Sequence, residues 1–201
     1  MKTILLCLFS LITFAEFEVP SIPAGNQMKC FKKSCSLVGR WDCKDNWERR
    51  KLLDSCTRQQ DLNCIKTSLK SLSSFEVDDV FEVAKVNKSC QYVDSLALKK
   101  SLKLVKSYEY DDINEVSSLN DAHWLTSKDC LDDTYSKIRT FNLDLRDFKA
   151  VARNCGGSYE KGCLIELCKY RGSFGCDELE EVREVLKSCV YPPLPHQRRR
   201  L

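Results

Sequence analysis

Apolar residues are spaced for two amphipathic helices in each of five successive segments of the chain. An aromatic residue marks the segments at intervals of 34, 33, 33 and 33 residues: Trp41, Phe75, Tyr108, Phe141 and Phe174. Apolar side chains stand at the tenth, sixth and usually third position before the aromatic, as in Ile65, Leu69 and Leu72. Steps of four and three residues place them on one helical face. The first half of each segment is therefore predicted to be an amphipathic helix.

A second apolar stripe follows the aromatic. It occupies the fifth, eighth and eleventh positions after it, as in Val80, Val83 and Val86. The fourth segment fits once a one-residue deletion in its turn is allowed. The first segment is the least regular, with Asn46 and Arg49 in this stripe. Each segment thus predicts two helices joined by a short turn, which is a helical hairpin.

Prolines stand only outside this array, as expected when helices fill it. Pro23 precedes the first segment and Pro192 follows the last, and the alternating patterns of a β structure are missing. A constant interval of this length is typical of a repeat array. The predicted fold is all-α, a right-handed, solenoid-like array of five disulfide-clasped helical hairpins with a period of about 33 residues. It covers residues 27–190, between a linker at 16–26 and a Pro/Arg-rich tail at 191–201.

An acidic helix start lies between the two stripes. The same Asp-x-x-Glu spacing recurs in three segments: Asp45 and Glu48, Asp79 and Glu82, Asp112 and Glu115. This is the spacing of a capping box, in which the Asp accepts from a first-turn amide and the Glu reaches back. Paired carboxylates also suit acid–base catalysis, but a pair that recurs in repeat after repeat favours the structural interpretation.

In period and hairpin architecture, residues 27–190 resemble the tetratricopeptide class and its cysteine-rich exported relatives. The W-x₂-L-G-x₂-Y consensus of that class is absent, and this chain's own signature is aromatic-x-x-D-D-x-x-E-V ahead of a cysteine. The resemblance implies a solenoid with a binding surface. It carries over no catalytic residue.

The first fifteen residues have the pattern of a secretory signal peptide. Lys2 provides the positive charge and residues 4–14 a short, mostly apolar run, while Thr13 and Ala15 are small residues suited to a cleavage site. This apolar run is too short to span a bilayer, and so is every later one. We therefore expect residues 1–15 to be removed and the protein to be secreted or periplasmic.

The cysteines point to a disulfide framework. Cleavage would remove Cys7 and leave twelve of thirteen cysteines, an even number that suggests full pairing. Four segments have a cysteine 11 residues before the aromatic and another 15 residues after it, or 14 in the fourth segment. The third segment lacks both and has Ala97 and His123 at these positions. Joint presence favours pairing within one hairpin, because antiparallel helices bring these two points together.

Four clasps are therefore predicted: Cys30–Cys56, Cys64–Cys90, Cys130–Cys155 and Cys163–Cys189. Two further pairs would staple the turns of the terminal hairpins: Cys35–Cys43 and Cys168–Cys176. A rival wiring joins the end of one segment to the start of the next, for example Cys56–Cys64, but it leaves several cysteines without a neighbour. Zinc binding is less favoured, because the closely spaced C-x₂-C pairs of zinc sites are missing.

Charge and composition narrow the chemistry. The chain has 32 basic and 29 acidic residues, a formal charge of +3, which argues against a dedicated nucleic-acid binder. His123 and His196 are its two histidines, and pairing leaves no cysteine as a nucleophile. There is no Gly-rich phosphate loop. The sequence predicts a non-enzymatic protein without a cofactor or metal.

The unclasped third segment is one candidate binding region. It contains Tyr108, Tyr110, His123 and Trp124. These residues are either a flexible or ligand-contacting centre, or parts of a unit that lost its disulfide and packs Trp124 in its place. The second interpretation is favoured.

Two other features remain as candidates. Arg198, Arg199 and Arg200 in the tail either touch an acidic partner or surface, or belong to a solvated terminus. Asn87-Lys88-Ser89 is a formal N-glycosylation sequon.

The function expected from these features is that of a monomeric binding module. Its partner would be a protein or a cell-surface component, because repeat arrays present extended surfaces. The chain is not expected to bind nucleic acid or span a membrane. Two alternatives stay open: a secreted enzyme or enzyme inhibitor with a site assembled across repeats, and a structural envelope protein.

Overall fold

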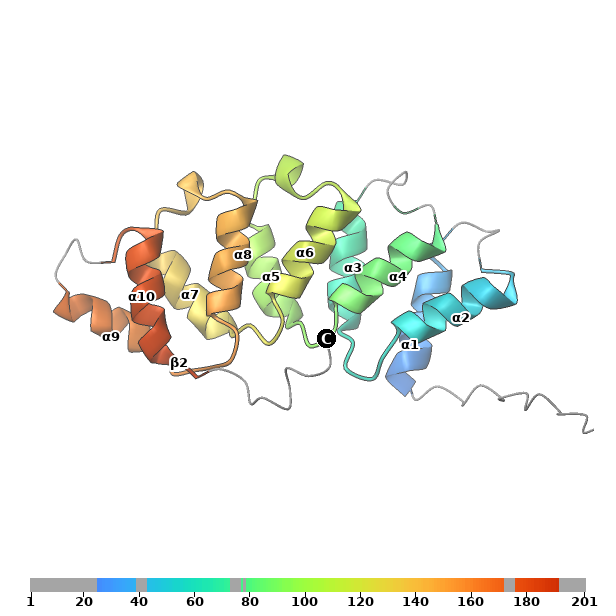
Figure 1. The fold of residues 1–201 in the computed structure, drawn as a ribbon, viewed down its shortest axis with the longest axis horizontal. Coiled ribbons are helices and arrows are strands. Elements are labelled where there is room, and N and C mark those ends of the chain that lie inside the picture. Colours follow the sequence, from blue (N-terminus) through green and yellow to red (C-terminus); the bar gives the residue numbers. More distant parts are fainter. Residues whose placement is uncertain (1–24, 39–42, 73–76, 78, 172–175, 192–201) are drawn as a thin grey trace, which may run out of the picture.

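Helices make up most of the structure, as the apolar stripes predict. The computed structural model describes residues 25–38, 43–72, 77, 79–171 and 176–191 (Figure 1). Within them lie ten α-helices, two short 3₁₀ helices and one two-stranded sheet. The predicted all-α class is confirmed.

Two α-helices come from each repeat. In chain order they are α1 (Gly25–Cys35), α2 (Asn46–Ser55), α3 (Leu62–Ser71), α4 (Val80–Ser89), α5 (Ser95–Leu102), α6 (Ile113–Ala122), α7 (Lys128–Lys137), α8 (Leu145–Asn154), α9 (Cys163–Tyr170) and α10 (Leu179–Cys189). The short elements are η1 (Ser107–Glu109), η2 (Thr140–Asn142), β1 (Ser158–Tyr159) and β2 (Val190–Tyr191). The predicted signal peptide at 1–15 and the tail residues Arg198, Arg199 and Arg200 lie outside the described residues.

The α-helices form two layers (Figure 1). The even-numbered helices stand side by side, each packed on the next from α2 to α10, and the odd-numbered helices lie behind them. Within the second layer α3 packs on α5, α5 on α7 and α7 on α9. Corresponding positions of successive repeats therefore line up along the length of the array.

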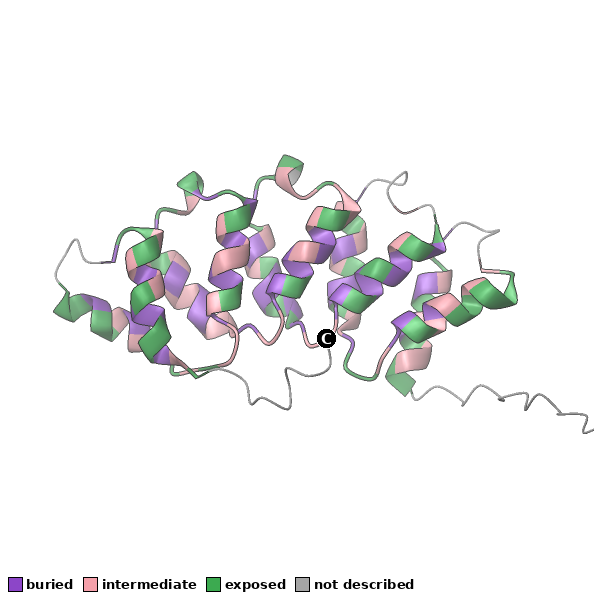
Figure 2. Ribbon diagram, viewed as in Figure 1, coloured by how far each residue is buried: buried purple, intermediate pink, exposed green. Residues whose placement is uncertain are grey.

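The predicted apolar stripes form the core. Ile65, Leu98 and Leu131, each ten positions before the repeat aromatic, are fully buried, as are Val83 and Phe148 in the even layer. Along each helix, buried and exposed residues alternate with the helical period (Figure 2). Burying one side chain of this size contributes roughly 1.5–3 kcal/mol. Stacking is what makes such burial possible, because a single hairpin leaves its apolar faces uncovered.

Acidic residues begin the even-numbered helices as predicted. Asp79 accepts from two first-turn amides of α4, and Glu82 Oε2 accepts from Asp79 N at 3.4 Å. Asp45 and Glu48 form the same capping box on α2. Asp112 likewise accepts from two first-turn amides of α6. These carboxylates are therefore committed to helix termini.

Six disulfides join the cysteines in the pairs predicted from the sequence. The four clasps span 25 or 26 residues and the two staples span 8, with Cα–Cα distances of 5.5 to 5.8 Å. Each clasp contributes about 3 kcal/mol by restricting the unfolded chain. The terminal hairpins thus carry two bonds each, the second and fourth one each, and the third none.

Backbone hydrogen bonds also link the loops between successive hairpins. Tyr92 N donates to Gln59 O at 3.1 Å and Leu125 N donates to Tyr92 O at 2.9 Å. Gly157 N continues the series by donating to Leu125 O at 3.0 Å. Tyr92, Leu125 and Gly157, at equivalent positions of three loops, all have positive φ. At the end of the series β1 pairs with β2, which includes Tyr191, a residue that the sequence assigns to the tail.

A buried asparagine clamps the third hairpin to the second. Asn120 on α6 is 1% exposed. Its Nδ2 lies 2.8 Å from Ser68 Oγ on α3 and 3.0 Å from Ser89 Oγ on α4. Its Oδ1 accepts from Ser68 Oγ at 3.1 Å. One amide therefore joins both helices of the preceding repeat, and it fixes how the two hairpins are aligned.

Asn87 on α4 makes the same clamp one repeat earlier. Its Nδ2 lies 2.8 Å from Ser34 Oγ on α1 and 2.9 Å from Ser55 Oγ on α2, and its side chain is fully buried. The Asn87-Lys88-Ser89 sequon is consequently inaccessible to glycosylation in the folded protein. What looks in the sequence like a modification site is an inter-repeat contact.

Replacement of Asn120 by alanine leaves the hydroxyl groups of Ser68 and Ser89 without their shared partner. Leaving buried polar groups unsatisfied is costly, so we expect Asn120→Ala to lower the free energy of unfolding by about 2 kcal/mol. Urea denaturation of the oxidised protein, followed by circular dichroism, measures this change. Asn114→Ala, at an exposed position of the same helix, removes only a solvent-exposed hydrogen bond from Lys85; it is the matched control and should change the free energy of unfolding by no more than about 0.5 kcal/mol. Equal destabilisation by both variants would contradict the clamp.

Candidate functional site

The exposed stripe of α1, α3 and α5 is occupied mainly by lysine. It comprises the residues 12, 9, 8 and 5 positions before the repeat aromatic, a spacing that keeps them on one side of a helix. The lysines on it are Lys29, Lys32, Lys33, Lys66, Lys70, Lys99, Lys100 and, at the C-cap of α5, Lys103. We call these eight side chains the lysine face. The three helices contain no Asp or Glu.

Only one lysine of this face is paired with a carboxylate of the described residues. Lys100 Nζ lies 2.6 Å from Asp132 Oδ1, and the other ion pairs of the described residues involve none of the remaining seven. Lysines three or four residues apart on one helix, such as Lys29 and Lys33, disfavour the helix by about 0.2–0.5 kcal/mol per pair. Apart from Lys100, the lysine face is therefore not neutralised by carboxylates of the described residues, and its charge is open to a partner.

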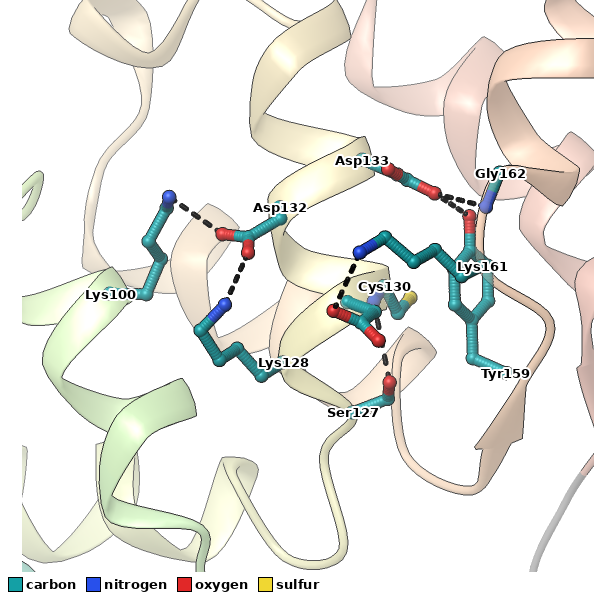
Figure 3. Close-up of polar contacts among 10 residues, drawn as sticks. Lys100, Ser127, Lys128, Cys130, Asp132, Asp133, Tyr159, Lys161 and Gly162 are labelled. Atoms are coloured by element: carbon teal, nitrogen blue, oxygen red, sulfur yellow. Dashed lines mark hydrogen bonds and ion pairs between the residues drawn. The ribbon is translucent and has the colours of Figure 1, made fainter.

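The charge of the stripe reverses at α7. The position nine residues before the aromatic is Lys in α1, α3 and α5, and it is Asp132 in α7. Asp132 Oδ2 lies 2.6 Å from Lys128 Nζ, and its Oδ1 lies 2.6 Å from Lys100 Nζ (Figure 3). Although partial burial acts in the opposite direction, hydrogen bonds from Lys100 and Lys128 hold the pKa of the Asp132 carboxyl below its ordinary value. Asp132 thus stays charged where the lysine face ends.

The other carboxylates of α7 also find partners within the chain (Figure 3). Asp133 Oδ2 accepts from Tyr159 OH at 2.6 Å and from Gly162 N at 2.8 Å. Burial and the hydrogen bond to Asp133 raise the pKa of Tyr159, so Tyr159 keeps its proton as a donor. Asp129 Oδ1 lies 3.9 Å from Lys161 Nζ. The negative charge of α7 is therefore used to hold neighbouring elements, unlike the positive charge of the lysine face.

The third hairpin has a buried chain of hydrogen bonds where the others have a clasp. His123 is fully buried, and its Nδ1 donates to Leu119 O at 2.8 Å. Its Nε2 must then accept from Ser101 Oγ at 2.8 Å, which leaves Ser101 Oγ to accept from Tyr135 OH at 2.9 Å. It is His123, and not Trp124 as the sequence suggested, that occupies the place of the disulfide.

The four residues singled out in the third segment do not form one site. Tyr108 is 68% exposed on η1, at the turn of the hairpin, whereas His123 is buried at the far end of α6. Tyr110 is partly buried against the core. Trp124 packs edge-on against Tyr92, with ring centroids 6.4 Å apart. Burial of His123 and Ser101 also keeps substrates away from this Ser–His pair.

Cavities in the described residues lie elsewhere. One of about 360 Å³ lies between α8 and α10 and is lined in part by Arg153, Asn154 and Lys187. Lys187 is neutralised by Glu184 at 2.5 Å. No cluster of three or more His, Cys, Asp or Glu suited to a metal ion occurs in the described part of the chain.

Comparisons with known proteins bring no relative to light. No protein-family model matches the chain, and no curated protein or solved structure is significantly similar to it. Among the described helices, none is long and apolar enough to cross a membrane. The chemistry of the lysine face must therefore be interpreted from its own residues.

Protonation of His123 should weaken the fold in acid. Burial lowers its pKa from 6.5 to about 4, so between these pH values the unfolded chain takes up a proton that the folded chain does not. We expect the free energy of unfolding to fall by up to about 3 kcal/mol as the pH drops from 6.5 to 4. Above pH 6.5 His123 is neutral in both the folded and the unfolded chain, so protonation of His123 no longer lowers the stability.

His123→Gln is the comparison for this measurement, because glutamine is polar but takes up no proton in this range. Urea titrations at several pH values should show that the difference in stability between wild type and variant shrinks as the pH falls. A constant difference across the range would mean that His123 does not control the acid sensitivity.

Proposed function

We propose that this protein is an exported, non-enzymatic binding module that attaches to an anionic component of the cell surface through its lysine face. The observation that carries the proposal is the charge of α1, α3 and α5, in which every charged residue is lysine. Seven of the eight lysines of the face have no ion-pair partner among the described residues. Unneutralised charge of one sign favours an oppositely charged partner.

Export is supported by the disulfides. Six bonds in a chain of 201 residues are typical of oxidising compartments, where such bonds persist. The predicted signal peptide at 1–15 agrees with this assignment. Clasped hairpins also suit a protein that must keep its shape outside the cell.

Rigidity of the scaffold supports a binding role. The lysines project from helices that are fixed by stacking, by clasps on α1 and α3, and by the asparagine clamps. Charges held in place before contact lose less conformational entropy on binding than charges on a mobile loop. The array therefore presents a preorganised charged surface.

The alternatives receive less support. An enzyme or inhibitor needs a site with converging polar groups, and the Ser101–His123 pair is buried. A structural envelope protein needs no segregation of charge, whereas here every charged residue of α1, α3 and α5 is lysine and carboxylates appear in the same stripe at α7. Binding through the lysine face accounts for this asymmetry.

Charge reversal on the face should abolish attachment to cells. The variant Lys32→Glu/Lys66→Glu/Lys99→Glu changes one exposed residue on each of α1, α3 and α5. Because it replaces attraction by repulsion, we expect at least a tenfold loss of binding of the fluorescently labelled protein to intact cells of the source organism, measured by flow cytometry.

The matched control makes the same change of net charge on the even-numbered helices. Arg50→Glu/Lys88→Glu/Arg146→Glu alters exposed residues of α2, α4 and α8 and should bind cells within about twofold of wild type, since surface substitutions away from an interface have small effects. Undiminished binding by the lysine-face variant, with melting curves showing that it is folded, would rule out the proposed function.

A further inference from the structure

We infer that the partner of the lysine face is a linear, densely sulfated polysaccharide. This inference rests on the proposed function, because it names the class of surface component that the face would bind. It is argued from the arrangement of the lysines, from the residues between them and from the place where the face ends.

The lysines form rows along the length of the array. Lys32, Lys66 and Lys99 occupy the same position of three successive repeats, and α3 and α5 pack side by side. Packed helices lie about 8–10 Å apart, so the row advances by about one helix width from Lys66 on α3 to Lys99 on α5. A flexible chain with anionic groups along its length can follow such a row and meet a new ammonium group on each helix.

The type of cation argues against nucleic acid. All basic residues of α1, α3 and α5 are lysine and none is arginine. Lysine acts as a hydrated point charge, whereas planar, two-pronged recognition of phosphate and nucleic acid favours arginine. Single-stranded nucleic acid also calls for exposed aromatic side chains on which bases stack. No aromatic residue stands on the exposed stripe of these helices.

The residues among the lysines argue against a folded protein as the partner. They include the small polar residues Ser36, Asn63 and Thr67. The centres of protein interfaces are enriched in aromatic residues, Met and Arg and depleted in Lys. A polar, lysine-rich surface is better suited to a hydrated polymer.

The end of the face argues against a lipid bilayer. A flat surface that covers the odd-numbered layer also meets α7 and α9, where the same stripe carries Asp129, Asp133 and Glu166. Stable attachment to a bilayer further needs apolar side chains that insert, and Leu96 is the single exposed apolar residue on the stripe of α1, α3 and α5. A linear chain can instead lie across three helices and avoid the carboxylates.

A second copy of the protein is also a poor partner. Its α7 carboxylates would have to pair with the lysine face, but Asp132 is held by Lys100 and Lys128, and Asp133 by Tyr159. Negative charge from outside the chain is therefore needed, and sulfate esters supply it at high density.

The test uses the purified, oxidised protein and defined probes in surface plasmon resonance. Heparin is the sulfated chain, and chemically desulfated heparin is the same chain without most of its charge. We expect heparin to bind at least tenfold more tightly than its desulfated form. Because binding releases counterions, the affinity should fall at least tenfold between about 50 and about 200 mM salt.

Variants locate the binding on the lysine face. For Lys32→Glu/Lys66→Glu/Lys99→Glu we expect at least tenfold weaker binding to heparin, and a plot of log affinity against log salt whose slope is smaller by about two to three. The control Arg50→Glu/Lys88→Glu/Arg146→Glu has the same net charge and should retain affinity within about twofold. Equal weakening of both variants would overturn the inference, because net charge alone would then explain the binding.

Two further probes separate this inference from the proposed function. Vesicles of phosphatidylcholine with phosphatidylserine stand for a bilayer, and a single-stranded oligonucleotide stands for nucleic acid. Tighter binding to either of these than to heparin would overturn the polysaccharide while leaving attachment through the face intact. If the protein does not bind heparin but the lysine-face variant loses cell binding, the polysaccharide inference would be overturned and the proposed function would stand. Retention of cell binding by that variant would instead overturn the proposed function.

Discussion

Stacking of one hairpin on the next is the constraint from which the rest of the structure follows. Each hairpin has two apolar faces, and only neighbours can cover them. Apolar contact alone tolerates sliding, however, because it is non-directional. Directional bonds remove that freedom: Asn87 and Asn120 each reach both helices of the preceding repeat, and backbone bonds such as Leu125 N to Tyr92 O join the loops. Alignment of the repeats is thus fixed by polar groups inside an apolar core.

This alignment creates the lysine face. A single lysine on one helix is an ordinary solvated residue. Lys32, Lys66 and Lys99 are far from one another in the sequence, at intervals of about 33 residues. They become neighbours along a line only because equivalent positions of successive repeats are superposed by stacking. The clamps and the proposed binding surface are therefore linked: a hairpin that slid along its neighbour would move its lysines out of the row. Rigid alignment serves recognition as well as stability.

Sequence patterns were sufficient to predict the hairpins and the disulfides, because helical periodicity is visible within one segment and the cysteine positions can be compared among the five. The contacts between segments were not predictable in this way. Asn87 matched a glycosylation sequon, and only burial against Ser34 and Ser55 identifies it as a clamp. The aromatic that marks each segment gave the repeat interval, yet Tyr108 is exposed. Sequence spacing thus located the repeats, and packing between them decided what each polar residue does.

The boundary between the two halves of the odd-numbered layer lies at the hairpin without a clasp. Two adjacent residues of α5 face α7 there: Lys100 pairs with Asp132 at the surface, and Ser101 hydrogen-bonds Tyr135 in the interior. Ser101 also hydrogen-bonds His123. His123 stands at the repeat position that a cysteine occupies in the other hairpins. Non-covalent bonds therefore join the two helices of the hairpin that lacks a clasp and tie this hairpin to the next one. Asp132, the carboxylate at which the lysine face ends, pairs with Lys100 of the third hairpin. The residue that limits the proposed binding surface therefore also supports the hairpin that has no clasp.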